Sequence, residues 1–213
     1  STGSDSNPRI GVVMENQVKD LKVAMAGVID VPDRLIDYIA AGRQLHDRVQ
    51  AESSRLAAAP SAGNLEEVTL HAPLRPGKVI GVGLNYVEHV EESSRSLDTD
   101  KDLPTRPVLF SKPGTAVVGP GVPIRHNGDL TQQLDWECEL AVVMGSPTLG
   151  VSETDALNHV FGYSIINDIS ARDQRRSGQW FFSKGQDSYA PFGPMIVTTD
   201  EISDPHTLQL SLT

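Results

Sequence analysis

The sequence predicts an α+β, strand-rich fold in which a small N-terminal α+β domain precedes a larger strand-rich core. Three observations lead to this expectation. A length of 213 residues suffices for one sizeable hydrophobic core with or without a small second unit. The 18 glycines and 14 prolines indicate many turns rather than long helices. From about residue 70 the chain consists of short apolar runs bounded by Gly and Pro, so we expect the small domain and its linker over 1–69 and the core over 70–213.

The small domain is predicted from three patterns. Residues 9–15 form a short β-like run, and residues 23–29 are expected to return beside it. Apolar side chains at near-helical spacing between residues 35 and 49 predict a helix. The small residues of 57–63 are typical of a linker.

The core is predicted as a series of strands. Residues 134–144 alternate at first and then become continuously apolar, as in a strand with one solvated and one buried end, so we expect them at the centre of a sheet. Ser152 and Asp155 have the spacing of a capping box and predict a short helix to about His159. Further strand-like runs are 78–86, 107–113, 115–124, 160–170, 179–185, 190–199 and 208–213.

Charge and cysteine content exclude several classes of partner. The net charge is −10 and no Lys/Arg cluster could follow a phosphate backbone, so nucleic acid is not expected. An acidic surface repels an anionic substrate unless a cation or a few placed basic residues reverse the local field. The single cysteine, Cys138, cannot form an internal disulfide, and no apolar run approaches a membrane span. We therefore expect a cytoplasmic protein with no membrane partner.

Three carboxylates in one predicted strand indicate a metal site. Asp135, Glu137 and Glu139 alternate along the strand and should point to the same side. Such a group repels itself and needs protons or a cation unless it is fully wet. A solvated strand face is the alternative, but the apolar run that follows directly favours a cation. Oxygen ligands of this kind suit Mg²⁺, Mn²⁺ or Ca²⁺ rather than zinc.

Two further positions could carry chemistry. Asp168 follows an apolar strand, where ligand and catalytic groups often emerge, although a cap or turn acceptor is an equally good interpretation. His89 and Glu92 are three residues apart and would share a helical face, so that Glu92 could orient His89 as a general base. A surface ion pair of this spacing is common, and the pair alone is weak evidence.

Five segments together resemble one known family, in both order and spacing. The match covers roughly residues 73–197, and the family is the fumarylacetoacetate hydrolase superfamily, including its acylpyruvate hydrolases and its 2-hydroxyhepta-2,4-diene-1,7-dioate isomerases. The resemblance implies a mixed β-sheet roll that pairs as a homodimer. The segments that carry it are 81–92 (GVGLNYVEHVEE), 110–124 (FSKPGTAVVGPGVPI), 134–145 (LDWECELAVVMG), 167–174 (NDISARDQ) and 183–194 (SKGQDSYAPFGP).

The resemblance also implies a role for each candidate site residue. The metal, Mg²⁺ or else Mn²⁺ or Ca²⁺, would be held by three carboxylates, with Asp135 in support. A dyad on a lid would activate water, a lysine would neutralise a developing oxyanion, and basic and aromatic side chains would bind the substrate. The metal ligands would be Glu137, Glu139 and Asp168, and the water-activating dyad would be His89 and Glu92. The lysine at the oxyanion would be Lys184, and the substrate-binding residues would be Arg172, Arg175 and Tyr86.

The implied activity is chemistry on a small keto or enol carboxylic acid. We expect hydrolysis of a carbon–carbon bond in an acylpyruvate-like or fumarylpyruvate-like diketo acid. A decarboxylase or a keto–enol isomerase built on the same site is the closest alternative. A non-catalytic homologue that serves as an assembly or binding subunit is a third possibility.

Two departures from the family pattern bear on this expectation. Members commonly carry Gln seven residues after the metal aspartate, whereas this chain has Arg175. Arg175 could hold a second substrate carboxylate, or it could point outward and pair with Asp173 or another acid. Relatives also continue past residues 208–213 into a segment with a Gly-Thr-Pro turn, so the core is expected to lack the family's C-terminal segment.

Overall fold

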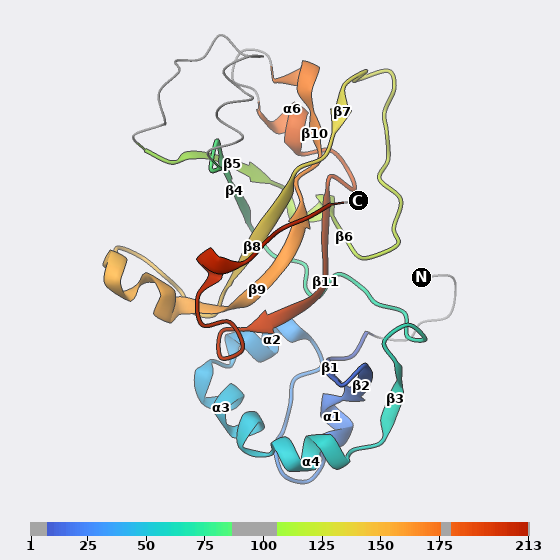
Figure 1. Ribbon diagram of the computed structural model, residues 1–213, viewed down its shortest axis with the longest axis vertical. Helices are drawn as coiled ribbons and strands as arrows, with labels where there is room; N and C mark the ends of the chain where they lie inside the picture. Colours follow the sequence, from blue (N-terminus) through green and yellow to red (C-terminus); the bar gives the residue numbers. More distant parts are fainter. Residues whose placement is uncertain (1–7, 87–105, 176–179, 213) are drawn as a thin grey trace.

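The computed structural model describes residues 8–86, 106–175 and 180–212 and shows a strand-rich α+β fold (Figure 1). The N-terminal part contains a three-stranded antiparallel sheet in the order β1-β2-β3 and four short helices. The strands are β1 (Gly11–Met14), β2 (Gln17–Asp20) and β3 (Ser61–Asn64), and the helices are α1 (Leu21–Ala24), α2 (Leu35–Ala40), α3 (Arg43–Ala51) and α4 (Ser53–Ala58).

The chain reverses after β1 sooner than the sequence predicts. Glu15 and Asn16 adopt positive φ angles of 49° and 75° and close a two-residue hairpin, so β2 pairs directly with β1. The expected return strand over 23–29 is therefore wrong. Asp20 instead caps α1, because its side chain accepts a hydrogen bond from the Val23 amide. The helix predicted between 35 and 49 is present as two helices, divided at Gly42, whose φ of 86° ends the first.

The core contains a four-stranded mixed sheet and two smaller antiparallel pairs. The large sheet has the order β6-β11-β9-β8, with β6 parallel to β11 and the other neighbours antiparallel. The run 134–144 is expected from the sequence at the centre of a sheet, but its longer strand, β8, is the outer strand of this order within the described residues. Its strands are β6 (Val117–Val118), β8 (Cys138–Met144), β9 (Val160–Asn167) and β11 (Ala190–Thr198). The pairs join β4 (Val79–Gly83) to β5 (Val108–Lys112) and β7 (Leu134–Asp135) to β10 (Ser170–Ala171).

Short helical turns lie between these strands: η1 (Gly114–Ala116), η2 (Glu153–His159), η3 (Arg172–Gln174) and α6 (Trp180–Lys184). Another, η5 (Pro205–Thr207), follows β11. Ser152 caps η2 as predicted, since its side chain accepts a hydrogen bond from the Asp155 amide. The run 179–185 is not a strand, because 180–184 forms α6. Residues 208–212, also expected as a strand, belong to no regular element.

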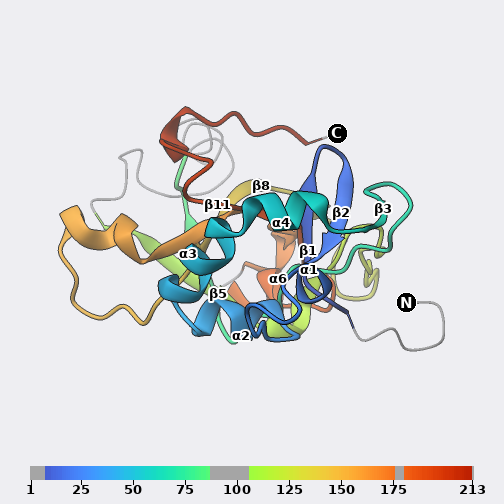
Figure 2. The ribbon, with the colours of Figure 1, turned by 90° about the horizontal axis from the view of Figure 1, so that it is seen from below.

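The N-terminal part and the core have separate clusters of buried side chains. Leu21, Met25, Tyr38 and others form a cluster within the N-terminal residues, and Phe161 of β9 packs against it. Gln50 of α3 also donates a 2.7 Å hydrogen bond to Asp200, which follows β11. The core has its own cluster around β6, β9 and β11. Figure 2, seen from below, shows the N-terminal helices in front of the core strands. The boundary near residue 70 stays a prediction.

No helix within the described ranges has both the length and the apolar character that a bilayer crossing requires.

Candidate active site

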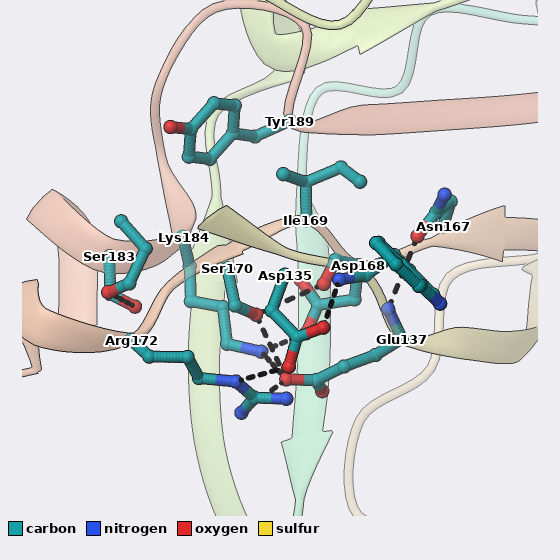
Figure 3. A network of polar contacts seen from close by, with 12 residues as sticks. Asp135, Glu137, Asn167, Asp168, Ile169, Ser170, Arg172, Ser183, Lys184 and Tyr189 are labelled. Atoms are coloured by element: carbon teal, nitrogen blue, oxygen red, sulfur yellow. Dashed lines mark hydrogen bonds and ion pairs between the residues drawn. The ribbon is translucent and has the colours of Figure 1, made fainter. Parts of the chain in front are cut away.

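Strand pairing brings three acidic residues from two segments together. Glu137 lies between β7 and β8, Glu139 lies in β8, and Asp168 follows β9, the antiparallel partner of β8. The Asp168 amide donates a 2.8 Å hydrogen bond to the Glu137 carbonyl, and the Glu137 amide donates to the Asn167 side chain (Figure 3). One carboxylate oxygen from each of Glu137, Glu139 and Asp168 lies within 4.8 Å of the other two. The three predicted metal ligands therefore share one site.

The electrostatics of this cluster fit a divalent cation. Burial, followed by the charges of Asp168 and Glu137, raises the pKa of Glu139 to about 7. Asp168 is 1% exposed, and its Oδ1 atom lies 2.6 Å from the Lys112 ammonium but accepts no well-directed hydrogen bond from the described part of the chain. Three clustered carboxylates, whose burial and mutual repulsion raise the pKa of Glu139, are a donor set suited to Mg²⁺, Mn²⁺ or Ca²⁺.

Two positively charged side chains, those of Lys184 and Arg172, contact the edge of the acidic cluster. The Lys184 ammonium, 2% exposed at the end of α6, donates hydrogen bonds to Glu137 Oε1 at 3.0 Å and to Asp168 Oδ2 (Figure 3). Arg172 lies 2.7 Å from Glu137 Oε1 through Nη1 and 2.9 Å from Asp135 Oδ2 through Nε. Burial opposes ionisation of Glu137, but the charges of Lys184 and Arg172 outweigh burial and lower the pKa of this carboxyl. Asp135 is thus a partner of Arg172 rather than a member of the acidic cluster.

Lys112 is part of this site and was not predicted from the sequence. It ends β5 with its ammonium 2.6 Å from Asp168 Oδ1. Burial lowers the pKa of Lys112 to about 8, against the opposing effect of the Asp168 charge. The sequence did offer one indication of this role. Lys112 stands two residues after the apolar run 107–110, in a segment that carries the family resemblance.

The predicted substrate-binding residues lie near the cluster. The Tyr86 hydroxyl accepts a long 3.5 Å hydrogen bond from the amide of Leu140, next to Glu139. The Arg175 guanidinium lies 4.2 Å from the ring centre of Trp180, which stacks on Phe110. Burial, followed by the charge of Arg172, lowers the pKa of Arg175.

Arg175 does not make the outward contact considered above. The side chain of Asp173 accepts hydrogen bonds from the Thr131 hydroxyl and the Gln132 amide instead. His89 and Glu92, the predicted proton-transfer dyad, lie outside the described residues.

Comparison with known proteins places this site in a family context. A model of the fumarylacetoacetate (FAA) hydrolase C-terminal domain matches residues 78–213. The chain is 35% identical to "Oxaloacetate tautomerase fahd2, mitochondrial" of Xenopus laevis, over 96% of this chain and 62% of that protein. It is 36% identical to "Oxaloacetate tautomerase YisK" of Bacillus subtilis, over 94% of this chain and 69% of that protein. The chain therefore spans roughly two thirds of the length of these relatives.

Two solved structures share the fold. The fumarylacetoacetate hydrolase of Exiguobacterium antarcticum superposes with a TM-score of 0.70 at 38% identity, covering 92% of this chain and 64% of that one. The maleylpyruvate hydrolase of Sphingobium sp. SYK-6, solved with manganese and pyruvate, has a TM-score of 0.70 at 27% identity. It covers 94% of this chain and 67% of that one.

Proposed function

The chain belongs to the fumarylacetoacetate hydrolase family, and from this premise we propose that it is a divalent-metal-dependent enzyme that interconverts the keto and enol forms of a small 2-oxo dicarboxylic acid such as oxaloacetate. The observation that carries the proposal is the cluster of Glu137, Glu139 and Asp168 with Lys184 hydrogen-bonded at its edge. The oxaloacetate tautomerases among the relatives support the choice of reaction.

Tautomerisation needs a proton to leave C3 of the keto acid and a proton to join the oxygen at C2. A divalent cation held by Glu137, Glu139 and Asp168 would polarise the C2 carbonyl and offset negative charge as the C–H bond breaks. Lys184 supplies a fixed positive charge in a water-poor site, where such a charge is most effective on a developing oxyanion. The proton-transfer role remains with His89, oriented by Glu92.

The substrate must bind a chain whose net charge is −10. Arg172 lies at the edge of the acidic cluster, against Glu137, and Arg175 lies nearby on the face of Trp180. Both guanidinium groups are suited to carboxylates, because their N–H donors lie in one plane and can form two parallel hydrogen bonds. With the cation, they give the site a local field opposite to that of the surface.

Hydrolysis of a carbon–carbon bond is the second candidate. The likeness to a maleylpyruvate hydrolase favours it, and the leaving group would be the enolate of pyruvate, which the same site could stabilise. Decarboxylation of oxaloacetate would release carbon dioxide and also leave the enolate of pyruvate. An assembly subunit would instead bind the metal and turn over none of these compounds.

Product analysis with Mg²⁺ or Mn²⁺ decides between these activities. We expect enol-oxaloacetate to lose its ultraviolet absorbance faster with protein than with chelator-treated protein, and the product to keep the substrate's mass. Carbon dioxide and pyruvate would identify a decarboxylase, and pyruvate with a carboxylic acid from an acylpyruvate would identify a hydrolase. Metal binding without turnover of any of them would reject the enzyme proposal.

A cytoplasmic location and a homodimer remain proposals. The vertebrate relative is named as mitochondrial, whereas the Bacillus relative comes from a bacterium. Size-exclusion chromatography with light scattering measures the oligomer size directly.

Arg175→Gln is expected to weaken use of a dicarboxylate selectively. Arg175 makes no ion pair within the described residues, and its ring contact with Trp180 leaves the in-plane N–H donors available to an anion. Loss of one charge-assisted contact should raise KM by about ten-fold or more for the dicarboxylate. The measurement compares KM for oxaloacetate with KM for a monocarboxylate 2-oxo acid.

The control for this substitution is Arg43→Gln, at a side chain that is 77% exposed in the N-terminal part. It should leave both KM values unchanged. An equal rise for both substrates after Arg175→Gln, or a rise for neither, contradicts a role for Arg175 in holding a second carboxylate.

A further inference from the structure

The side chain of Lys112 is buried, and its ammonium forms hydrogen bonds to main-chain carbonyls. It is 3% exposed, and its ammonium donates hydrogen bonds to the main-chain carbonyl oxygens of Ile169 at 2.9 Å, Lys184 at 2.7 Å and Tyr189 at 2.7 Å. An ammonium has three N–H donors, and each of these three is directed at a carbonyl. Lys112 therefore has no donor left for a substrate.

The three carbonyls belong to segments that carry the site. Ile169 follows Asp168, Lys184 is itself a site residue at the end of α6, and Tyr189 precedes β11 (Figure 3). Lys112 reaches them from β5, so one ammonium joins this strand to three points between residues 169 and 189. The ammonium thus contacts the backbone directly after Asp168 and the backbone of Lys184 itself.

From this geometry we infer that Lys112 is a positioning residue of the metal site, acting through the main chain next to Asp168 and at Lys184. The inference rests on the proposed function, because it assigns Lys112 to the same metal site. Outer partners that orient metal ligands typically contribute about 10- to 100-fold in metal affinity. Lys112 differs from most such partners in holding the backbone of the ligand segment.

Charge and position predict opposite effects when Lys112 is removed. Its ammonium lies 2.6 Å from Asp168 Oδ1, so removing its charge should strengthen the attraction of the carboxylates for another cation. Removing its hydrogen bonds takes a donor from three carbonyls, of which that of Tyr189 still accepts the Ile169 amide at 3.2 Å, and it lets the segments next to Asp168 and at Lys184 shift. The positioning role requires the second effect to dominate, so that metal affinity falls.

The test is Mn²⁺ affinity of Lys112→Met, measured from the electron paramagnetic resonance signal of unbound Mn²⁺. We expect the affinity to fall by about 10- to 100-fold. The matched control is Lys19→Met. Lys19 is another buried lysine, 7% exposed, and its ammonium donates to the Ala59 carbonyl in the N-terminal part. Both variants should unfold at a lower temperature, but Lys19→Met should bind Mn²⁺ like the wild type.

Lys112→Arg separates position from charge and provides the answer if Lys112→Met does not fold. A planar guanidinium keeps the charge but cannot direct three N–H groups as a tetrahedral ammonium does, so Mn²⁺ affinity should fall again. Wild-type affinity in Lys112→Arg, or unchanged or tighter binding in Lys112→Met, would overturn the positioning role. A wild-type protein that binds no Mn²⁺ would instead reject the proposed metal site itself.

Discussion

Glu139→Gln is expected to abolish measurable binding of Mg²⁺ or Mn²⁺, and turnover with it, while the metal-free protein folds at least as well as the wild type. Glu139 contributes one of the three clustered oxygens, and it makes no ion pair within the described residues. Glu137 and Asp168 both have lysine partners, so substituting either one would also disturb those pairs. Glu139 is therefore the position where ligand loss is best separated from structural damage.

The same substitution should also change how the stability of the metal-free protein depends on pH. The pKa of Glu139 rises from an ordinary 4.5 to about 7, first through burial and then through Asp168 and Glu137. The folded state thus binds the proton more tightly than the unfolded state, and stability falls as pH rises from about 4.5 through about 7. Glutamine does not titrate. At pH 8 the metal-free variant should exceed the wild type by at most on the order of 3 kcal/mol, and the advantage should shrink toward pH 5.

Calorimetric titration with Mn²⁺ at pH 8 measures the affinity, and urea unfolding with chelator at pH 5 and pH 8 measures the stability. Glu66→Gln is the control, because Glu66 is exposed in the N-terminal part. Unchanged Mn²⁺ affinity after Glu139→Gln would contradict the proposal that the carboxylate cluster binds the metal. Loss of affinity together with a large loss of metal-free stability would show that Glu139 supports the fold instead.

The acidic cluster could be predicted from the sequence, but strand alternation alone predicts the wrong set of carboxylates. Glu137 and Glu139 are two residues apart and do meet, and Asp168 joins them because β9 pairs with β8. Alternation would also bring in Asp135. The regular strand breaks at Trp136 and Glu137, however, and Arg172 binds the Asp135 side chain. Pairing between distant segments decided which carboxylates cluster.

The helix α6 and the role of Lys112 could not be derived from local patterns. Trp180, Ser183 and Lys184 have the i, i+3, i+4 spacing of one helix face, and Ser183 and Lys184 are buried. Phe181 and Phe182 lie between them and are 60% and 50% exposed. A run of aromatic residues suggested a strand, but burial follows the helical spacing. Lys112 acquires its role only when three separate carbonyls surround it, which sequence periodicity does not encode.

Lys184→Met is expected to lower turnover by about 100- to 1,000-fold while changing Mn²⁺ affinity by less than about ten-fold. The turnover loss is expected because the proposed mechanism places this buried positive charge beside the substrate oxygen that becomes negative. Two effects on metal affinity oppose each other. Glu137 and Asp168 lose a competing cation, which favours the metal, but they also lose the hydrogen bonds that orient their side chains. The backbone remains held by Lys112 through the Lys184 carbonyl, so these effects should largely offset.

Steady-state kinetics and Mn²⁺ titration on the same preparation test this expectation. Methionine keeps the length and apolar stem of the side chain, and Lys78→Met, at an exposed position before β4, is the control for loss of a positive charge. The loss should appear in kcat rather than in KM, because the charge acts on the oxyanion that develops during the reaction. A change confined to KM would assign Lys184 to substrate binding. A loss of Mn²⁺ affinity as large as the loss of turnover would mean that Lys184 acts by holding the metal ligands, and the oxyanion role would be wrong.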